Sequence, residues 1–493
     1  MQDPQLIRQF RAARRVSTPL MAIQTPDPAA TMDRVATCFN GAPPPIVRWD
    51  IVNGMAGMNE PGTAAVAEAA GPEPAMTTGN PVEALTAAQK LPPSTALFML
   101  NAQRYLDNEA VIQAIWNLRD RFKADFRTLV MLCPAIALPP ELAQDVLALD
   151  EALPDEEELG RIIRETCAAA QLPDPDEQLV TKAVDALSGL ASFPAEQAAA
   201  MSLTRDGLVL EDLWERKRRM IEQTPGLSVW RGGETFADIG GVQNAKTFLT
   251  RVLRGNDPPR AVVFIDEIEK ALGGQGDTSG VSQSLLGTLL TWMQDNRATG
   301  MLAIGPPGSA KSMLAKAAGA EAGIPTIAFD LTGMKASLVG ESEQRLRNAL
   351  KVVTAVSQGR SLFIATCNSL AVLPPELRRR FTFGTFFFDL PTAEERKLIW
   401  DLYLGKYALP QEPLPPDDGW TGAEIRQACE LAWRLGCTLV EASAYIVPVA
   451  RSASEQIARL RNEANGRFIS ASHPGVYTAS RPESAGRAIT LEE

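Results

Sequence analysis

The chain has 493 residues, 45% of them hydrophobic, and a formal net charge of −11 from 48 Lys and Arg and 59 Asp and Glu. This length and apolar content predict about three folded domains and exclude wholesale disorder. The acidic balance argues against nonspecific binding to DNA or to an anionic membrane. No signal peptide or bilayer-spanning apolar run is visible, so we expect a cytoplasmic protein without membrane contact.

The cysteines and the histidine narrow the chemistry further. Six cysteines are scattered without a CxxC pair, and the single histidine is His473, near the end of the chain. This excludes a nucleophilic site that pairs Ser or Cys with a core histidine, and it excludes a His-rich metal site. We expect the cysteines to be reduced thiols in the core.

Residues 1–153 alternate short apolar stretches with helical ones, which predicts a βαβ sheet. Strands are expected at Leu20–Gln24, Pro45–Trp49, Ala96–Leu100 and Thr128–Leu132, helices at Ala110–Phe122 and Pro140–Leu147, and a flexible loop at Gly57–Leu91. The first strand is followed by Thr25-Pro26-Asp27-Pro28 and the third by Asn101-Ala102, which offer no residues for nucleotide chemistry. The sequence therefore predicts a nucleotide-binding fold that lacks its nucleotide motifs.

Residues 154–230 are predicted to form a helical connector. Acidic residues at Asp155–Glu158 suit a helix start, and basic residues at Lys217–Arg219 suit a helix end. We interpret its charged face as solvated surface.

The next predicted domain, residues 231–390, contains an apolar run, Ala261–Ile265, followed directly by Asp266 and Glu267. A buried parallel strand of this kind delivers two carboxylates to the edge where α/β folds bind ligands. There Asp266 would order Mg²⁺ and its waters, and Glu267 would be the general base for an attacking water. Taken alone, the stretch is also compatible with two solvated acids at a strand end.

A glycine-rich loop follows the apolar run Met301–Ile304 and precedes a predicted helix. Its sequence is Gly305-Pro306-Pro307-Gly308-Ser309-Ala310-Lys311-Ser312. A strand, a glycine loop and a helix start are typical of a phosphate-binding loop, whose amides and helix dipole surround phosphate oxygens. Lys311 would supply a cation for the β and γ oxygens, and Ser312 would hold Mg²⁺. Ala310 stands where a second glycine is usual, and a chance turn before a helix is the competing interpretation.

A further apolar strand, Ser361–Cys367, ends at Asn368, which can position a water or sense the γ-phosphate. A helix then ends in Arg378, Arg379 and Arg380. Their planar guanidinium groups can reach the phosphate site of a neighbouring subunit. The alternative is a basic helix end that complements its own dipole.

The remaining chain is predicted to be a helical lid at residues 391–465 and a tail at 466–493. One lid helix begins near Gly422 and Ala423. The tail is rich in Ser, Gly, Ala and Pro, so we expect it to be mobile or to act as a docking extension.

Over about residues 234–450 these motifs resemble the AAA+ ATPase family. The resemblance implies ATP and Mg²⁺ as ligands, and it assigns each motif a role. Walker A is Gly305–Ser312 with Met313, and Walker B is Asp266 and Glu267. The first sensor is Asn368, and the second sensor is Gly422 and Ala423. The residues beside the adenine are Asp238, Ile239 and Gly240, and the arginine fingers are Arg379 and Arg380, with Arg378 as third candidate.

The resemblance extends to the "hypothetical chloroplast reading frame" AAA+ proteins of plastids and cyanobacteria. It is carried by Gly340-Glu341-Ser342-Glu343, by the Leu290-Thr291-Trp292 helix and by the amino-terminal sheet domain. The expected fold is therefore α/β: an AAA+ P-loop parallel sheet with a helical lid, preceded by a degenerate RecA-like α/β domain.

The order of the motifs departs from the family, because Walker B precedes Walker A. We hypothesise a permutation that keeps the sheet intact, in the usual AAA+ spatial order of fifth, first, fourth, third and second strand. A second departure is Leu338, which stands where threading motors usually present an aromatic side chain.

The leading functional hypothesis is a homo-oligomeric ATPase, a hexamer, that couples hydrolysis to the remodelling of a protein client. One alternative is a nucleotide-gated assembly scaffold. A DNA-associated motor is the third, kept open by the basic clusters Arg216–Arg219 and Arg378–Arg380.

Overall fold

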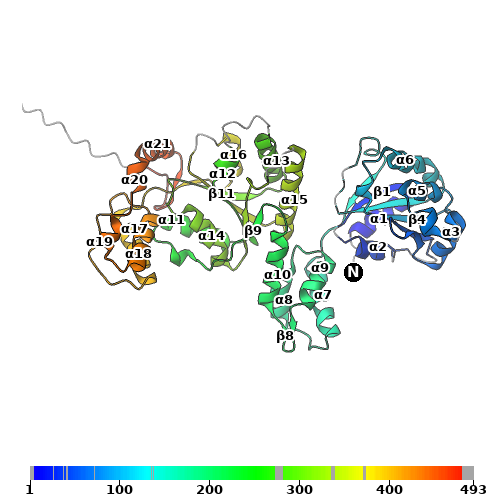
Figure 1. Ribbon diagram of the computed structural model, residues 1–493, viewed down its shortest axis with the longest axis horizontal. Coiled ribbons are helices and arrows are strands. Elements are labelled where there is room, and N and C mark those ends of the chain that lie inside the picture. The colour runs from blue at the N-terminus through cyan, green and yellow to red at the C-terminus, as the bar shows by residue number, and fades with distance from the viewer. Residues whose placement is uncertain are drawn as a thin grey trace, which may run out of the picture. The chain divides into compact units, whose positions relative to one another are not determined.

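The computed structural model describes residues 5–25, 27–36, 38–39, 43–71, 73–134, 136, 138–272, 281–334, 339–369 and 373–479. The chain forms two compact units, Met1–Val209 and Leu210–Glu493 (Figure 1). The predicted connector is therefore divided, since its first three helices belong to unit 1 and its last helix to unit 2. Among the described residues, no helix has both the length and the apolarity needed to cross a membrane.

Unit 1 is built on a six-stranded sheet in the order β3-β2-β4-β5-β1-β6, parallel except for the β2–β3 pair. The α/β class is thus confirmed. The strands are β1 (Leu20–Gln24), β2 (Ile46–Asp50), β3 (Gly54–Gly57), β4 (Ala96–Leu100), β5 (Thr128–Cys133) and β6 (Leu147–Asp150). The helices are α1 (Gln5–Arg15), α2 (Pro28–Ala36), α3 (Glu60–Ala70), α4 (Pro74–Thr77), α5 (Pro81–Ala88), α6 (Glu109–Ala124), α7 (Glu156–Ala169), α8 (Glu177–Leu187) and α9 (Ser192–Ala200).

Two predictions for unit 1 are wrong. The segment Gly57–Leu91, expected to be a flexible loop, forms α3, α4 and α5. Pro61, Pro74 and Pro81 stand in the first turns of these helices, where no backbone N–H is needed, and Asn59 and Asn80 cap the starts of α3 and α5. The expected helix Pro140–Leu147 is instead a series of turns leading into β6, and its last residue, Leu147, pairs in parallel with Met21 of β1.

Without β3, the parallel strands of unit 1 lie in the spatial order β6-β1-β5-β4-β2. Numbered by their position along the chain, these neighbouring strands are the fifth, first, fourth, third and second. The chain segments after β1 and β4 are those that the sequence showed to lack nucleotide motifs. Asn101, which follows β4, adopts a left-handed conformation with φ 53°.

Unit 2 contains a seven-stranded sheet in the order β15-β14-β11-β13-β10-β12-β9, parallel except for the β9–β12 pair. Its strands are β9 (Leu227–Val229), β10 (Ala261–Ile265), β11 (Thr299–Ile304), β12 (Thr326–Phe329), β13 (Ser361–Cys367), β14 (Thr385–Phe387) and β15 (Ile469–Ser470). Its helices are α10 (Leu210–Glu222), α11 (Gln243–Leu253), α12 (Ile268–Leu272), α13 (Val281–Asp295), α14 (Lys311–Ala322), α15 (Val339–Ser357), α16 (Pro375–Arg380), α17 (Ala393–Lys406), α18 (Gly422–Leu435), α19 (Leu439–Ser443), α20 (Val449–Ser452) and α21 (Ser454–Ala464).

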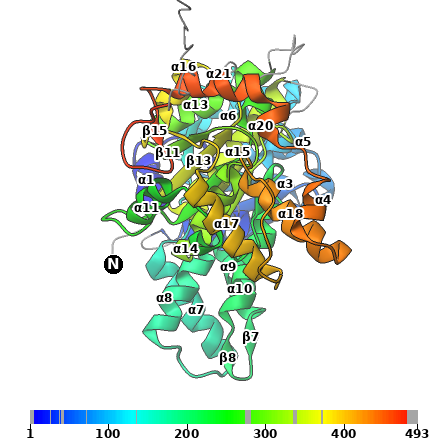
Figure 2. The same cartoon turned by 90° about the vertical axis from the view of Figure 1, so that its left-hand side faces the viewer.

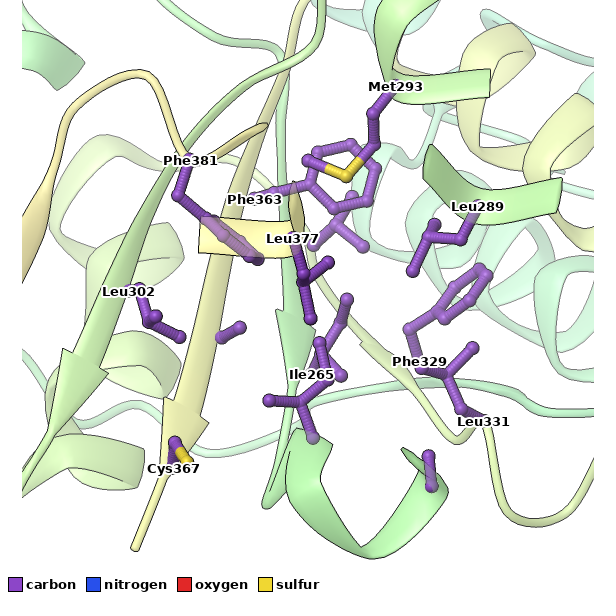
Figure 3. Packing of buried hydrophobic residues seen from close by; sticks show 14 of the residues in the cluster. Ile265, Leu289, Met293, Leu302, Phe329, Leu331, Phe363, Cys367, Leu377 and Phe381 are labelled. Atoms are coloured by element: carbon purple, nitrogen blue, oxygen red, sulfur yellow. The ribbon is translucent and has the colours of Figure 1, made fainter. Parts of the chain in front are cut away.

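The central strands of unit 2 are buried on both faces because helices cover each side. Alternate residues of β10 enter different clusters: Val263 and Ile265 pack toward α13, α15 and α16, whereas Val262 and Phe264 pack toward α11 and α14. Figure 3 shows Ile265 in one cluster with Leu289 and Leu377. Burial on both faces explains the continuous apolar runs in the sequence. The lid helices α17 and α18 lie side by side (Figure 2) and have their own core around Trp400 and Trp420.

The carboxyl-terminal segment differs from its prediction. Residues 466–479 were expected to belong to a mobile tail, yet β15 pairs with β14. Ala471 donates its N–H to Phe387 and accepts one from Ala245. Tyr477 is 8% exposed and donates its hydroxyl to Asp389 at 2.6 Å. The main-chain bonds of the sheet edge therefore outweigh the polar composition of this segment.

We expect Tyr477→Phe to lower the free energy of unfolding by about 1.5 kcal/mol, because it removes a partly buried hydrogen bond to a carboxylate. Arg461 also bonds to Asp389, with its Nε at 2.8 Å, and this ion pair should keep the variant folded. Urea unfolding of the full chain measures the change, with Tyr445→Phe as the control because Tyr445 is 71% exposed. Equal losses in both variants would contradict the assignment.

Candidate functional site

A cavity of about 390 Å³ lies in unit 2 at the carboxyl ends of β10, β11 and β13. This is the edge at which open α/β sheets bind ligands. Fifteen residues proposed from the sequence line it: Asp238, Ile239, Gly240, Asp266, Glu267, Pro307, Gly308, Ser309, Ala310, Lys311, Ser312, Met313, Asn368, Gly422 and Ala423. Segments distant in the chain therefore meet around one space.

The glycine-rich loop connects β11 to α14, as its sequence predicted. Gly308 has φ 81°, and a Cβ there would approach Thr421 Oγ1 to 2.8 Å, so the loop lies directly against the start of α18. Gly305 has no room for a side chain, because a Cβ would meet the Phe388 carbonyl at 2.0 Å. Ala310 adopts the left-handed conformation, with φ 65°. The usual glycine preference at this position is thus explained, and alanine bears a modest strain.

Lys311 is buried, at 5% exposed, and folds back on its own loop. Its Nζ donates to the Gly305 carbonyl at 2.9 Å, to the Pro306 carbonyl at 2.6 Å and to Ser309 Oγ at 3.2 Å. Burial lowers its pKa to about 8, although nearby acidic groups raise it in part. Gly305 and Pro306, proposed as ligand-binding residues, do not line the cavity and instead hold this ammonium. Phosphate oxygens would be stronger partners for it than neutral carbonyls.

The two carboxylates after β10 line the same cavity as the loop. Asp266 Oδ1 accepts hydrogen bonds from Ser312 Oγ at 2.8 Å and from Thr366 Oγ1 at 2.6 Å. Glu267 Oε1 accepts a bond from Asn368 Nδ2 at 2.9 Å, and its Oε2 forms an ion pair with Lys270. Thr366 Oγ1 also accepts the main-chain N–H of Glu267 at 2.9 Å, so the predicted acids, serine and asparagine form one connected hydrogen-bonded set.

Glu269 fixes the main chain at Asn368, whose N–H it accepts at 2.9 Å. Its second oxygen, Oε2, is buried without a hydrogen-bond partner among the described residues. The Cys367 thiol beside it has a pKa raised by burial and by this carboxylate. Cys367 is thus a protonated core thiol, as expected from the sequence.

The other end of the cavity is more apolar. Asp238, Ile239 and Gly240 meet Ile399 and Tyr403 of α17 there. A Cβ on Gly240 would reach Ile399 Cγ1 at 2.4 Å, so the turn packs closely on the lid helix. A flat heterocycle would find apolar walls and main-chain polar groups in this region.

The arginines of α16 do not line this cavity. Arg380 donates to Gln294 Oε1 at 2.6 Å. Arg379 is exposed and makes no side-chain hydrogen bond or ion pair with any described residue. Arg378 is half-buried. The structure therefore does not place these three residues at their own subunit's cavity.

Several lining residues were not singled out from the sequence. They are Val242, Thr366, Asp389, Pro391, Arg426, Ser472 and the lid residues Glu395, Ile399 and Tyr403. Asp389 had a readable signal, since it follows an apolar run as Asp266 does. Ser472 had none, because it reaches the cavity only through the pairing of β15 with β14.

The residues present fit a magnesium nucleotide. A serine hydroxyl and a carboxylate already in contact are the hard oxygen donors that Mg²⁺ prefers. The loop amides at the start of α14 and the Lys311 ammonium suit phosphate oxygens. No described group of His, Cys, Asp and Glu forms a separate cluster of metal-ligand type.

Comparison with known proteins identifies related domains along the chain. Residues 5–151 match the family described as "SpoVK-like AAA ATPase, N-terminal domain", residues 157–224 its "second domain", and residues 301–360 the "ATPase family associated with various cellular activities (AAA)". The last match begins within β11, so it includes the loop but not Asp266 and Glu267.

Two relatives are both named "Uncharacterized AAA domain-containing protein ycf46". The protein from Trieres chinensis is 25% identical over 436 residues, 78% of this chain and 79% of its own. The one from Gracilaria tenuistipitata var. liui is 25% identical over 410 residues, 71% of this chain and 76% of its own. The chain therefore carries SpoVK-like AAA ATPase domains and is a distant homologue of the plastid ycf46 AAA proteins.

Proposed function

We propose that the protein is a homo-oligomeric, ATP-hydrolysing AAA+ machine, a hexamer, that remodels a protein client. The observation that carries the enzymatic part is the contact between Asp266 and Ser312, 2.8 Å apart, in the cavity that also holds Lys311 and Glu267. Phosphoryl transfer depends on positioning and on electrostatic stabilisation, which this set provides.

Each residue then has a defined task. Bound Mg²⁺ would neutralise charge on the phosphate oxygens. Ser312 and Asp266 would hold that ion, and the Lys311 ammonium would exchange its loop carbonyls for phosphate oxygens. Glu267 accepts a proton from the attacking water, and Asn368 orients the Glu267 carboxylate through its amide.

We also propose that the AAA+ domain is a natural permutation. The chain's own unit 1 supplies the reference. In spatial order, the five parallel strands of unit 1 are fifth, first, fourth, third and second in the chain. The corresponding strands of unit 2, β14-β11-β13-β10-β12, are fifth, second, fourth, first and third. The two sheets have the same spatial order if β10 and its helix originally followed β12 in the chain and were moved ahead of β11. Such a move breaks no topological rule.

A DNA motor is the least favoured alternative. Arg218 and Arg219 share one carboxylate, that of Glu215, at 3.6 and 3.3 Å, whereas Arg379 has no ion pair with any described residue. The formal net charge of −11 therefore remains the argument against this function. The departure at Leu338, where threading motors usually present an aromatic side chain, is not tested, because this residue lies outside the described residues.

Two measurements on the purified chain test the proposed function. Phosphate release from ATP is compared with and without Mg²⁺, and light scattering gives the mass with and without a nonhydrolysable ATP analogue. Mg²⁺-dependent turnover together with a hexameric mass supports the proposal. Assembly with the analogue but no turnover would favour the scaffold. If the chain showed neither turnover nor assembly, both the machine and the scaffold would be refuted.

We expect Arg379→Ala to bind ATP normally and to lose about 10³-fold or more in kcat, because an arginine supplied in trans stabilises the charge on the transferred phosphoryl group. Mixing it with Glu267→Gln subunits should restore part of the activity, since some interfaces then combine an intact Glu267 with an intact Arg379. Arg380→Ala serves as the comparison. If Arg379→Ala assembled and hydrolysed ATP at the normal rate, Arg379 would be excluded as the finger.

A further inference from the structure

The strand β13 carries a buried hydroxyl between the two acids of the site. Thr366 is 1% exposed and lies two residues before Asn368. Its Oγ1 donates to Asp266 Oδ1 at 2.6 Å and accepts the main-chain N–H of Glu267 at 2.9 Å. A hydroxyl has one proton to give and lone pairs to receive, so both bonds can exist at once. One side chain therefore contacts both residues of the Walker B pair.

Each of these bonds has a consequence for the site. At Asp266, Thr366 and Ser312 both donate to Oδ1, whereas no described residue bonds to Oδ2, which leaves that oxygen for a metal or its waters. At Glu267, φ is 46°, in the left-handed region that a glutamate rarely adopts. The bond from its N–H to Thr366 helps to hold this strained conformation, which aims the side chain at Asn368.

We infer that Thr366 is a positioning residue, which orients the metal-binding carboxylate of Asp266 and the general base Glu267 through one hydroxyl. This inference rests on the proposed function for its catalytic meaning. The geometry itself depends only on the hydrogen bonds of β10 and β13. A threonine with only a structural role would satisfy its own hydroxyl without affecting the metal or the base.

The test compares Thr366→Val, which keeps the branched shape but loses the hydroxyl, with Thr366→Ser, which keeps the hydroxyl. Valine should weaken Mn²⁺ binding in the presence of ADP, measured by electron paramagnetic resonance, and lower kcat, each by about 10- to 100-fold. Binding of a fluorescent ADP analogue without metal should stay within about threefold, because Lys311 and the loop are unchanged. Serine should restore both properties.

Thr326→Val is the matched control. Thr326 is also buried, at 4% exposed, and begins β12, but its hydroxyl bonds to the Lys316 carbonyl at 3.3 Å and not to the acids. If the valine variant at 366 does not fold, Thr366→Ala replaces it, with Thr326→Ala as control. Wild-type metal affinity and kcat in the folded variant would overturn the inference.

A crystal structure of unliganded Thr366→Val separates this inference from the proposed function. We expect Asp266 to turn away from Ser312, or Glu267 to leave the left-handed region. If the wild type hydrolyses no ATP, the proposed function fails while the crystal structure still decides the positioning. Unchanged conformations of both acids would refute the positioning role of Thr366.

Discussion

Glutamine in place of Glu267 is expected to leave ATP binding intact and to lower kcat by about 10²- to 10⁴-fold, the usual range for loss of a positioned general base. Glutamine has almost the same shape, and its carbonyl oxygen can still accept the bond from Asn368 Nδ2, 2.9 Å away in the wild type. What the amide cannot do is accept the proton of the attacking water. The variant should therefore hold ATP without turnover.

Stability should change little in this variant. The ion pair of Glu267 with Lys270 is lost, but the Lys270 side chain is 66% exposed, and exposed pairs contribute little. Phosphate release and binding of a fluorescent ATP analogue measure the two properties separately. Glu68→Gln, an exposed substitution on α3 of unit 1, is the control. Turnover at the wild-type rate would remove Glu267 as the base.

The central strands of both units could be predicted because they are buried on both faces. β1 and β4 have the predicted limits, and β5 extends by one residue. A run such as Ala261–Ile265 followed by two acids leaves little choice of structure. The segment Gly57–Leu91 was misjudged because its prolines and glycines resemble those of a loop. Pro61, Pro74 and Pro81 instead occupy helix starts, where their fixed φ suits the first turn.

The candidate site was predictable where one local motif carries the chemistry, as at Lys311 and Asp266. It was not predictable where the contact is made across the sheet. Thr366 appears in the sequence as one more residue of an apolar strand, and its role emerges only from the parallel pairing of β10 with β13. Ser472 enters the cavity through two residues of edge pairing, a signal too short for any sequence pattern.

Replacement of Lys311 by alanine should remove nucleotide binding, turnover or both. Truncating one partner of a buried charged pair costs about 2–5 kcal/mol, which is roughly 30- to 3,000-fold in affinity. Loss of the ammonium also leaves the γ-phosphate charge without its main protein cation in the transition state. The expected result is an unmeasurable phosphate release and a fluorescent ATP analogue bound at least about 30-fold more weakly.

The fold should survive this change, which allows the loss to be assigned to the site. The pKa of Lys311 is about 8 in the folded chain, below its ordinary value of 10.5, because burial disfavours the ammonium. At pH 7 the folded state therefore bears a penalty for this charge, a penalty that vanishes as pH rises through 8 toward 10.5. Lys311→Met, which keeps the length of the side chain without the charge, should have an unfolding free energy no lower than that of the wild type.

Urea unfolding at pH 7, together with binding of the fluorescent analogue, completes the comparison. Lys351→Ala, an exposed position on α15, removes the same charge away from the cavity and should change neither measurement. A folded Lys311→Met protein that bound and hydrolysed ATP like the wild type would show that the loop is not the phosphate site. The acids after β10 would then have no nucleotide to act on, and the cavity would need another ligand.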